Sequence, residues 1–156
     1  MSDAAVVRLL VFRVGTLSCA ADVESVREIL PRLTATRIPG APPVVEGLIN
    51  VRGTLVTLVG GHRALGQADP AADGAGTTIL LQVSGAAGAG GPAGPRLVGF
   101  TVDEVVDLLS VPGDSLERRR ALPGLDPTLV RAVGRRAGHV FVVLDTDALL
   151  GPILSS

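Results

Sequence analysis

Short apolar runs separated by glycine and proline restrict this chain to a fold built from short strands. The 156 residues include 20 glycines and 11 prolines, and the runs between them are rich in Val, Leu and Ile. Such runs are typical of strands, whereas Gly and Pro are typical of the turns that join strands. We count about eight to ten short strands, which predicts a mainly β fold of small barrels or a sandwich.

The strand pattern is similar in the two halves of the chain. The clearest strands are expected near residues 7–14, 17–21, 48–51, 54–59, 77–83, 97–102 and 140–144. We therefore expect one domain over residues 6–152, divided into two small subdomains at about residues 6–70 and 76–150. Residues 84–95 are rich in Gly, Ala and Pro, which predicts a flexible loop.

A few short segments are predicted to be helical. Within residues 23–30, apolar side chains including Val26 and Ile29 recur at helical spacing. Asp22 precedes this segment as a candidate N-cap, and Pro31 ends it. Single helical turns are expected at residues 44–46 and 148–150, and residues 128–132 fit either a helical turn or a strand.

Residues 47–59 are typical of a β-hairpin whose turn carries an arginine. Gly53 permits a positive φ, and Asn50 is suited to bond its own backbone two residues on and to adopt a left-handed conformation. Arg52 stands at the mouth of the hairpin with a planar fork of charged donors. From the residues alone, Arg52 either covers apolar surface with its stem or pairs with a carboxylate, of this chain or of a partner.

Charge and cysteine content exclude several classes of protein. The formal net charge is −1, so no global field steers the chain toward nucleic acid or an anionic membrane. Cys19 is the single cysteine, which excludes an intrachain disulfide and indicates a reduced setting. The first residues lack the pattern of a secretory signal, and no apolar run approaches the length of a membrane span. We expect a cytoplasmic protein with no direct membrane insertion.

The sequence lacks the common patterns for catalysis, metal binding and cofactor binding. Cys19, His62 and His139 lie far apart and lack the spacing of a metal site. Cys19 lies in an apolar strand, which favours a small buried side chain over a reactive thiolate. Asp145 and Asp147 precede a helical turn, where aspartate usually acts as a cap. The sequence therefore predicts a binding module rather than an enzyme, with no metal or cofactor.

Five segments in order along the chain resemble the CheW-like domain of bacterial chemosensory systems. The strongest is GLINVRG at residues 47–53, which matches the family pattern G-x-[IV]-N-x-R-G. The others are VESVREI at 23–29, TRIPGAP at 36–42, VGFTVDEV at 98–105, and the strand and tail at 140–150. Together they span nearly the whole chain.

This resemblance implies both a fold and a function. The implied fold is two small five-stranded, SH3-like β-barrel subdomains around a shared core, with short helices. CheW-like proteins are non-enzymatic adaptors that couple the cytoplasmic tip of a chemoreceptor to a CheA-type histidine kinase, which carries a related domain. The implied partners are the receptor tip, the regulatory domain of the kinase and other CheW-like domains, with recruitment of this chain to receptor clusters.

The resemblance also implies which residues bind these partners. The receptor hairpin is expected in the groove between the barrels, near Val26, Glu28 and Val98. The hairpin turn matches the best-known functional patch of the family, through Asn50, Arg52 and Gly53. An arginine at the centre of an interface is suited to be a binding hot spot.

The chain departs from the family pattern beside the expected kinase-docking surface, which includes Leu58 and Gly60. The pattern there is V-P-[IV]-[VI]-D-L-R, whereas residues 56–62 read VTLVGGH. Gly60 and Gly61 remove a carboxylate and an apolar contact from this surface and add chain entropy. An accessory protein that binds receptor or other CheW-like domains but not the kinase is therefore an alternative. A small β-barrel enzyme or ligand-binding domain is a third reading, which predicts a concave pocket with convergent polar groups.

Overall fold

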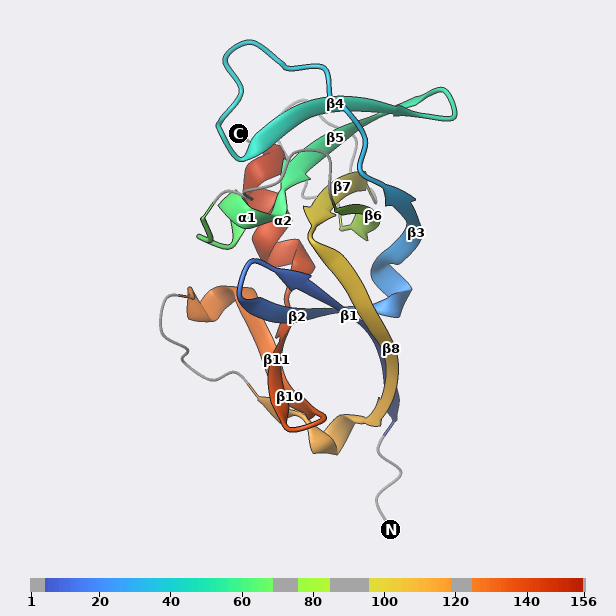
Figure 1. Ribbon diagram of the computed structural model, residues 1–156, viewed down its shortest axis with the longest axis vertical. Helices are drawn as coiled ribbons and strands as arrows, with labels where there is room; N and C mark the ends of the chain where they lie inside the picture. Colours follow the sequence, from blue (N-terminus) through green and yellow to red (C-terminus); the bar gives the residue numbers. More distant parts are fainter. Residues whose placement is uncertain (1–4, 69–75, 85–95, 119–124, 156) are drawn as a thin grey trace.

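The computed structural model describes residues 5–68, 76–84, 96–118 and 125–155 (Figure 1). The strands are β1 (Val6–Val14), β2 (Leu17–Asp22), β3 (Val26–Pro31), β4 (Val45–Val51), β5 (Thr54–Gly60), β6 (Thr77–Val83), β7 (Arg96–Val102), β8 (Glu104–Pro112), β9 (Glu117–Arg118), β10 (Val130–Arg136) and β11 (His139–Leu144). The helices are α1 (Gly61–Ala64) and α2 (Thr146–Ser155), with 3-10 turns η1 (Val23–Ser25), η2 (Gly113–Ser115) and η3 (Pro127–Leu129). The expected flexible loop at residues 84–95 lies outside the described residues, apart from Ser84.

The strands form two sheets, which we call sheet A and sheet B. Sheet A has six strands in the order β8-β1-β2-β11-β10-β9, and sheet B has five in the order β3-β6-β7-β5-β4. Neighbouring strands are antiparallel except for β2 with β11 and β5 with β7, which are parallel. In Figure 1, sheet B lies above sheet A. The prediction of a mainly β fold in two parts is confirmed.

Sheet membership does not follow the division expected at residues 70–76. Strands β1 and β2 from the start of the chain pair with β8 and β11, so sheet A contains both ends of the fold. Sheet B takes the continuous middle of the chain, including β6 and β7 from the expected second half. Both crossings between sheets are short, at β2 to β3 and at β7 to β8, because the strands on either side lie near the junction of the sheets.

Contacts between distant strands show that each sheet curls. Arg32 directly follows β3, at one edge of sheet B, and its Nη2 lies 3.5 Å from Oε1 of Glu46 in β4, at the other edge. In sheet A, Nε of Arg136 in β10 donates to Oδ2 of Asp107 in the edge strand β8 at 2.8 Å. A flat sheet would keep these strands far apart, because neighbouring strands lie about 4.8 Å apart. The curl encloses apolar side chains inside each sheet.

Strand β1 is buried on both faces, which explains its nearly continuous apolar sequence. Leu10, Phe12 and Val14 face a core that lies between the two sheets. Leu9 and Val11, on the opposite face, pack inside sheet A. Because successive side chains of a strand point to opposite faces, one apolar run supplies two separate cores.

The core between the sheets draws residues from both of them and holds the two parts together. It includes Phe12 of sheet A and Phe100 of sheet B, whose ring centroids are 6.1 Å apart in an edge-on arrangement. Leu149 and Leu150 of helix α2 complete it. The fold therefore has a shared core, as the sequence resemblance implied.

Cys19 lies in this shared core, and burial raises the pKa of its thiol to about 12. The prediction of a small buried side chain is confirmed. Because the thiolate is the reactive form, we expect Cys19 in the folded protein to resist a thiol reagent such as Ellman's reagent at mildly alkaline pH. The same thiol should react within seconds in guanidinium chloride, which is the control. Rapid labelling of the folded protein would contradict this placement.

The helix predicted for residues 23–30 is wrong. Only η1 is helical there, and Asp22 caps it as expected, its side chain accepting from Glu24 N at 3.0 Å. Residues 26–31 instead form β3, which pairs with β6 and alternates half-buried Glu28 with exposed Ile29. A segment of eight residues cannot hold a helix without packing, whereas pairing with β6 satisfies its backbone groups.

Three other local predictions also change. The expected helical turn at residues 44–46 is largely the start of β4, and residues 128–132 divide between η3 and β10. The turn expected at residues 148–150 is part of the longer helix α2. Asp145 acts as its cap, with Oδ1 accepting from Ala148 N at 3.0 Å. Among the described residues, no helix is both long and apolar enough to span a membrane.

Candidate functional site

The turn between β4 and β5 contains two residues, Arg52 and Gly53, both with positive φ, at 48° and 87°. This is the type I′ geometry that suits a two-residue hairpin because it matches the twist of the strands. Oδ1 of Asn50 accepts from Gly53 N at 2.8 Å, which is three residues on rather than the two we expected. The left-handed residue before the glycine is Arg52 and not Asn50. The turn thus fixes the backbone from which the Arg52 side chain extends.

Arg52 forms a two-point ion pair with Glu28. Its Nη1 donates to Oε2 of Glu28 at 3.1 Å, and its Nη2 donates to Oε1. Glu28 lies in β3 and Arg52 in the turn directly after β4, so the pair links the two edge strands of sheet B. The Arg52 side chain is nevertheless 70% exposed, against 33% for Glu28. Solvent therefore reaches the guanidinium while the carboxylate fixes its direction.

The electrostatics of this pair keep both groups charged. The hydrogen bond from Arg52, together with its charge, lowers the pKa of Glu28 below the ordinary value of a glutamate. The same hydrogen bond raises the pKa of Arg52. An exposed pair of this kind contributes little to stability, since water screens it. The geometry of the pair is better suited to recognising a carboxylate or a backbone carbonyl of a partner than to stabilising the fold.

An open pocket lies directly beside the pair. Its volume is about 480 Å³, and it is lined by Arg27, Glu28, Val51, Arg52, Thr54, Val56, Leu80, Gln82 and Leu97. Val56 and Leu80 are buried and form an apolar floor, whereas the charged and polar side chains stand at its rim. The arrangement can receive an apolar side chain of a partner while Arg52 contacts a polar group next to it.

Three of the eight residues expected to bind partners are buried, and a fourth is half-buried. Val98 and Leu58 are both 0% exposed, with Val98 in the core between the sheets and Leu58 inside sheet B. Gly60 is buried, and a Cβ there would lie 3.0 Å from Oε2 of Glu46. Val26 is half-buried against the shared core. The family pattern does not distinguish the outward-facing from the inward-facing residues of these strands.

The structure brings together the other four, which are Asn50, Arg52, Gly53 and Glu28. It also adds two apolar residues that sequence reasoning missed, Leu97 at 39% and Leu55 at 66% exposed. Leu97 precedes the buried Val98, so it must point to the opposite face of β7. That alternation was the available signal for Leu97, whereas nothing in the apolar run 54–59 distinguishes Leu55.

The second glycine of the unusual Gly60-Gly61 pair fits a close contact between α1 and β7. A Cβ on Gly61 would lie 2.0 Å from the carbonyl oxygen of Thr101, and Gly61 N donates to Oγ1 of the same residue at 3.1 Å. No side chain fits against that backbone without a shift of α1. The departure from the family pattern therefore has a packing reason.

We expect Gly61→Ala to lower the free energy of unfolding by about 2 kcal/mol, the usual cost of forcing extra atoms into a packed interior. Denaturant unfolding followed by circular dichroism measures the change. Gly151→Ala in helix α2 is the matched control, because nothing lies within 4 Å of a Cβ there. Since alanine also favours a helix, the control should be neutral or slightly stabilised. Equal effects of the two substitutions would contradict the close contact at Gly61.

The described residues contain no group of three or more His, Cys, Asp or Glu side chains that could hold a metal ion. His62 and Asp103 contact one another at the junction of the sheets, away from the pocket beside Arg52. The pocket beside Arg52 is lined by a mixture of charged, polar and apolar side chains.

The family model described as CheW-like domain matches residues 8–153. The chain is 34% identical over 142 residues to the chemotaxis protein CheW of Rhizobium meliloti (strain 1021), covering 90% of this chain and 85% of that protein. It is 27% identical over 145 residues to the chemotaxis protein CheW of Klebsiella aerogenes, covering 90% and 80%. The crystal structure of the scaffolding protein TtCheW from Thermoanaerobacter tengcongensis has the same fold, with a TM-score of 0.79 at 18% identity, covering 94% of this chain and 93% of that one. This chain belongs to the CheW-like domain family.

Proposed function

We propose that this protein is a non-enzymatic, cytoplasmic adaptor that couples the cytoplasmic tip of a chemoreceptor to a CheA-type histidine kinase. The observation that carries the proposal is the exposed ion pair of Arg52 and Glu28 at the rim of the pocket in sheet B. This pair lies in two of the segments that resemble the family pattern. Relatives with this domain are named as chemotaxis and scaffolding proteins, which supports the same role.

The pair and the pocket together suit a helical partner. A helix presents apolar and polar side chains one turn apart, so one can enter the pocket while the other meets Arg52. Arg52 is held by Glu28 before binding, which reduces the entropy lost when a partner engages it. Leu97 in the pocket wall and Leu55 on the hairpin add exposed apolar surface. Apolar anchors beside a directed arginine are typical of interface hot spots.

Co-sedimentation with a receptor-tip fragment and with the kinase regulatory domain tests this function. The expected result is that the chain binds each of them separately and increases the amount of kinase that sediments with receptor. Binding to neither fragment would contradict the proposal. A folded CheW-like domain with no affinity for either would leave ligand binding or catalysis as the remaining readings.

The alternative of an accessory protein, which binds receptor but not kinase, rested on Gly60 and Gly61. Both glycines are buried, and a Cβ on Gly61 would overlap Thr101, so packing accounts for at least the second of them. This observation favours the bridging adaptor over the accessory role. In the same co-sedimentation, receptor binding without kinase binding would reverse that preference.

A further inference from the structure

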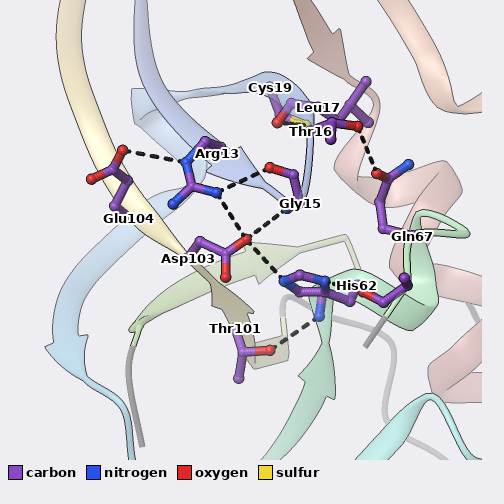
Figure 2. A network of polar contacts seen from close by, with 12 residues as sticks. Arg13, Gly15, Thr16, Leu17, Cys19, His62, Gln67, Thr101, Asp103 and Glu104 are labelled. Carbon is purple, nitrogen blue, oxygen red and sulfur yellow. Dashed lines mark hydrogen bonds and ion pairs between the residues drawn. The ribbon is translucent and has the colours of Figure 1, made fainter. Parts of the chain in front are cut away.

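His62 lies in α1, at the place where the two sheets meet (Figure 2). The residue is only 8% exposed, and both nitrogens of its ring have close partners. Nδ1 lies 2.5 Å from the carbonyl oxygen of Ala68, and Nε2 lies 2.9 Å from Oδ2 of Asp103. The adaptor role assigns no part to this buried ring.

Both partners of the ring are hydrogen-bond acceptors. A carbonyl oxygen can only accept, and so can an ionised carboxylate. Burial alone would raise the pKa of Asp103, but hydrogen bonds from Gly15 and His62 and the charge of Arg13 lower it below the ordinary value, which favours the ionised form. A neutral imidazole has one N–H and can satisfy only one of the two acceptors. The imidazolium has two and satisfies both.

Asp103 connects this ring to the other sheet. It lies between β7 of sheet B and β8 of sheet A, and its Oδ2 also accepts from Gly15 N at 2.6 Å. Gly15 is in the turn between β1 and β2. Asp103 N in turn donates to the carbonyl oxygen of Arg13 at 2.9 Å. One carboxylate therefore ties α1 and the turn of sheet A to the crossing between the sheets.

We propose that His62 links the two sheets in a proton-dependent manner. Both of its hydrogen bonds form when the ring carries two protons, and the link is weakened when the ring carries one. With one proton, the ring gives up its bond to Ala68 or its bond to Asp103. In the second case, Asp103 is left with Gly15 and Arg13 alone. This device is independent of the adaptor role and can fail or hold without it.

The strength of the contact between His62 and Asp103 also depends on the other charged groups around the ring. Nη1 of Arg13 lies 3.5 Å from Oδ2 of Asp103 and competes with the imidazolium for the carboxylate. Nε of Arg13 is engaged by Oε1 of Glu104 at 3.3 Å, which offsets part of its charge. Arg63 is the next residue in α1 and is exposed.

The sign of the pH dependence follows from the two acceptors. The folded chain holds the second proton of His62 between two acceptors that the unfolded chain lacks, so folding is favoured where that proton is bound. This stability is therefore lost as rising pH removes the second proton from the ring. The family pattern ends in arginine at the position of His62, and arginine offers several N–H donors at any physiological pH. His62→Arg is therefore the informative variant.

Thermal unfolding of the full chain between about pH 5.5 and pH 8 tests the proposal. We expect the Tm of the natural chain to fall by about 3 °C more than that of His62→Arg over this range, as the loss of one charge-assisted hydrogen bond predicts. His139→Gln, which changes the exposed second histidine, should keep the larger fall. Equal falls in the natural chain and His62→Arg would overturn the proposal.

Amide exchange in the unaltered chain gives a second test that needs no variant. We expect protection of Gly15 N–H, corrected for the intrinsic effect of pH, to decrease about tenfold as the ring loses its second proton, monitored by nitrogen chemical shifts of His62. Amides in the centre of β6 should show no such change. Constant protection of Gly15 through the titration of His62 would overturn the proposal even if His62→Arg fails to fold.

Discussion

Arg52→Glu is expected to abolish binding of this chain to a receptor-tip fragment while leaving its fold intact. The substitution places a second carboxylate opposite Glu28 and removes the exposed guanidinium at the rim of the pocket. Loss of a hot-spot arginine costs about 2 kcal/mol or more, which corresponds to at least ~30-fold weaker binding. Titration calorimetry measures the affinity, and circular dichroism checks the fold. Stability should change little because the pair is exposed.

Two variants separate the possible reasons for a loss of binding. Arg8→Glu makes the same change of charge at an exposed position of β1 in sheet A, and it should bind like the natural chain. The double variant that combines Arg52→Glu with Glu28→Arg restores an ion pair inside the chain. It reverses the charge that residue 52 presents to a partner. It should therefore remain defective. Recovery of binding in this double variant would mean that the pair only supports the hairpin, and unchanged binding of Arg52→Glu would remove Arg52 from the interface.

Phe100→Ala is expected to lower the free energy of unfolding by about 3–5 kcal/mol, which is the usual cost of emptying the space of a buried phenylalanine. Phe100 is 1% exposed in β7 and meets Phe12 of β1 across the shared core. Because this core belongs to both sheets, its loss should destabilise them together. We therefore expect one unfolding transition, shifted down in Tm by about 10 °C or more. Calorimetry measures the transition and its cooperativity.

Leu55→Ala is the control for this substitution, because Leu55 is a large apolar residue that is 66% exposed. Its effect on the free energy of unfolding should stay within about 0.5 kcal/mol. Two separate transitions in Phe100→Ala would contradict the shared core, since they would show that sheet A folds without sheet B. A small effect of Phe100→Ala would mean that other side chains fill the space.

Local signals in the sequence predicted most strands and the hairpin turn correctly. The strands expected near residues 54–59, 77–83 and 97–102 are β5, β6 and β7. Short apolar runs of this kind, ended by turn residues, form few structures other than strands. The same local reasoning failed at residues 23–30. Apolar residues at three- and four-residue spacing suit a helix, but β3 also alternates against β6, and pairing with a strand some 50 residues away cannot be read from that segment.

The candidate site was half predictable for a similar reason. The turn at Arg52 and Gly53 is specified by its own residues, and so is the charge that it presents. Arg52 pairs with Glu28 because sheet B curls. The curl brings the edge strand β3 close to β4, which is the strand at the opposite edge. Val98 was expected at the interface but is buried, whereas its neighbour Leu97 is exposed. The sequence could not show this, because only the packed structure shows which face of β7 is covered.

The sequence by itself determined the class of fold, the hairpin at residues 47–59, the absence of an intrachain disulfide and the membership of a family. These properties depend on residue type and on neighbours along the chain. The tertiary structure alone decided the pairing of β1 and β2 with β8 and β11, the pair of Arg52 with Glu28, and the meeting of His62 with Asp103. Those contacts join residues 24 or more positions apart, and they form because burial of apolar side chains curls each sheet and fixes how the two sheets lie together.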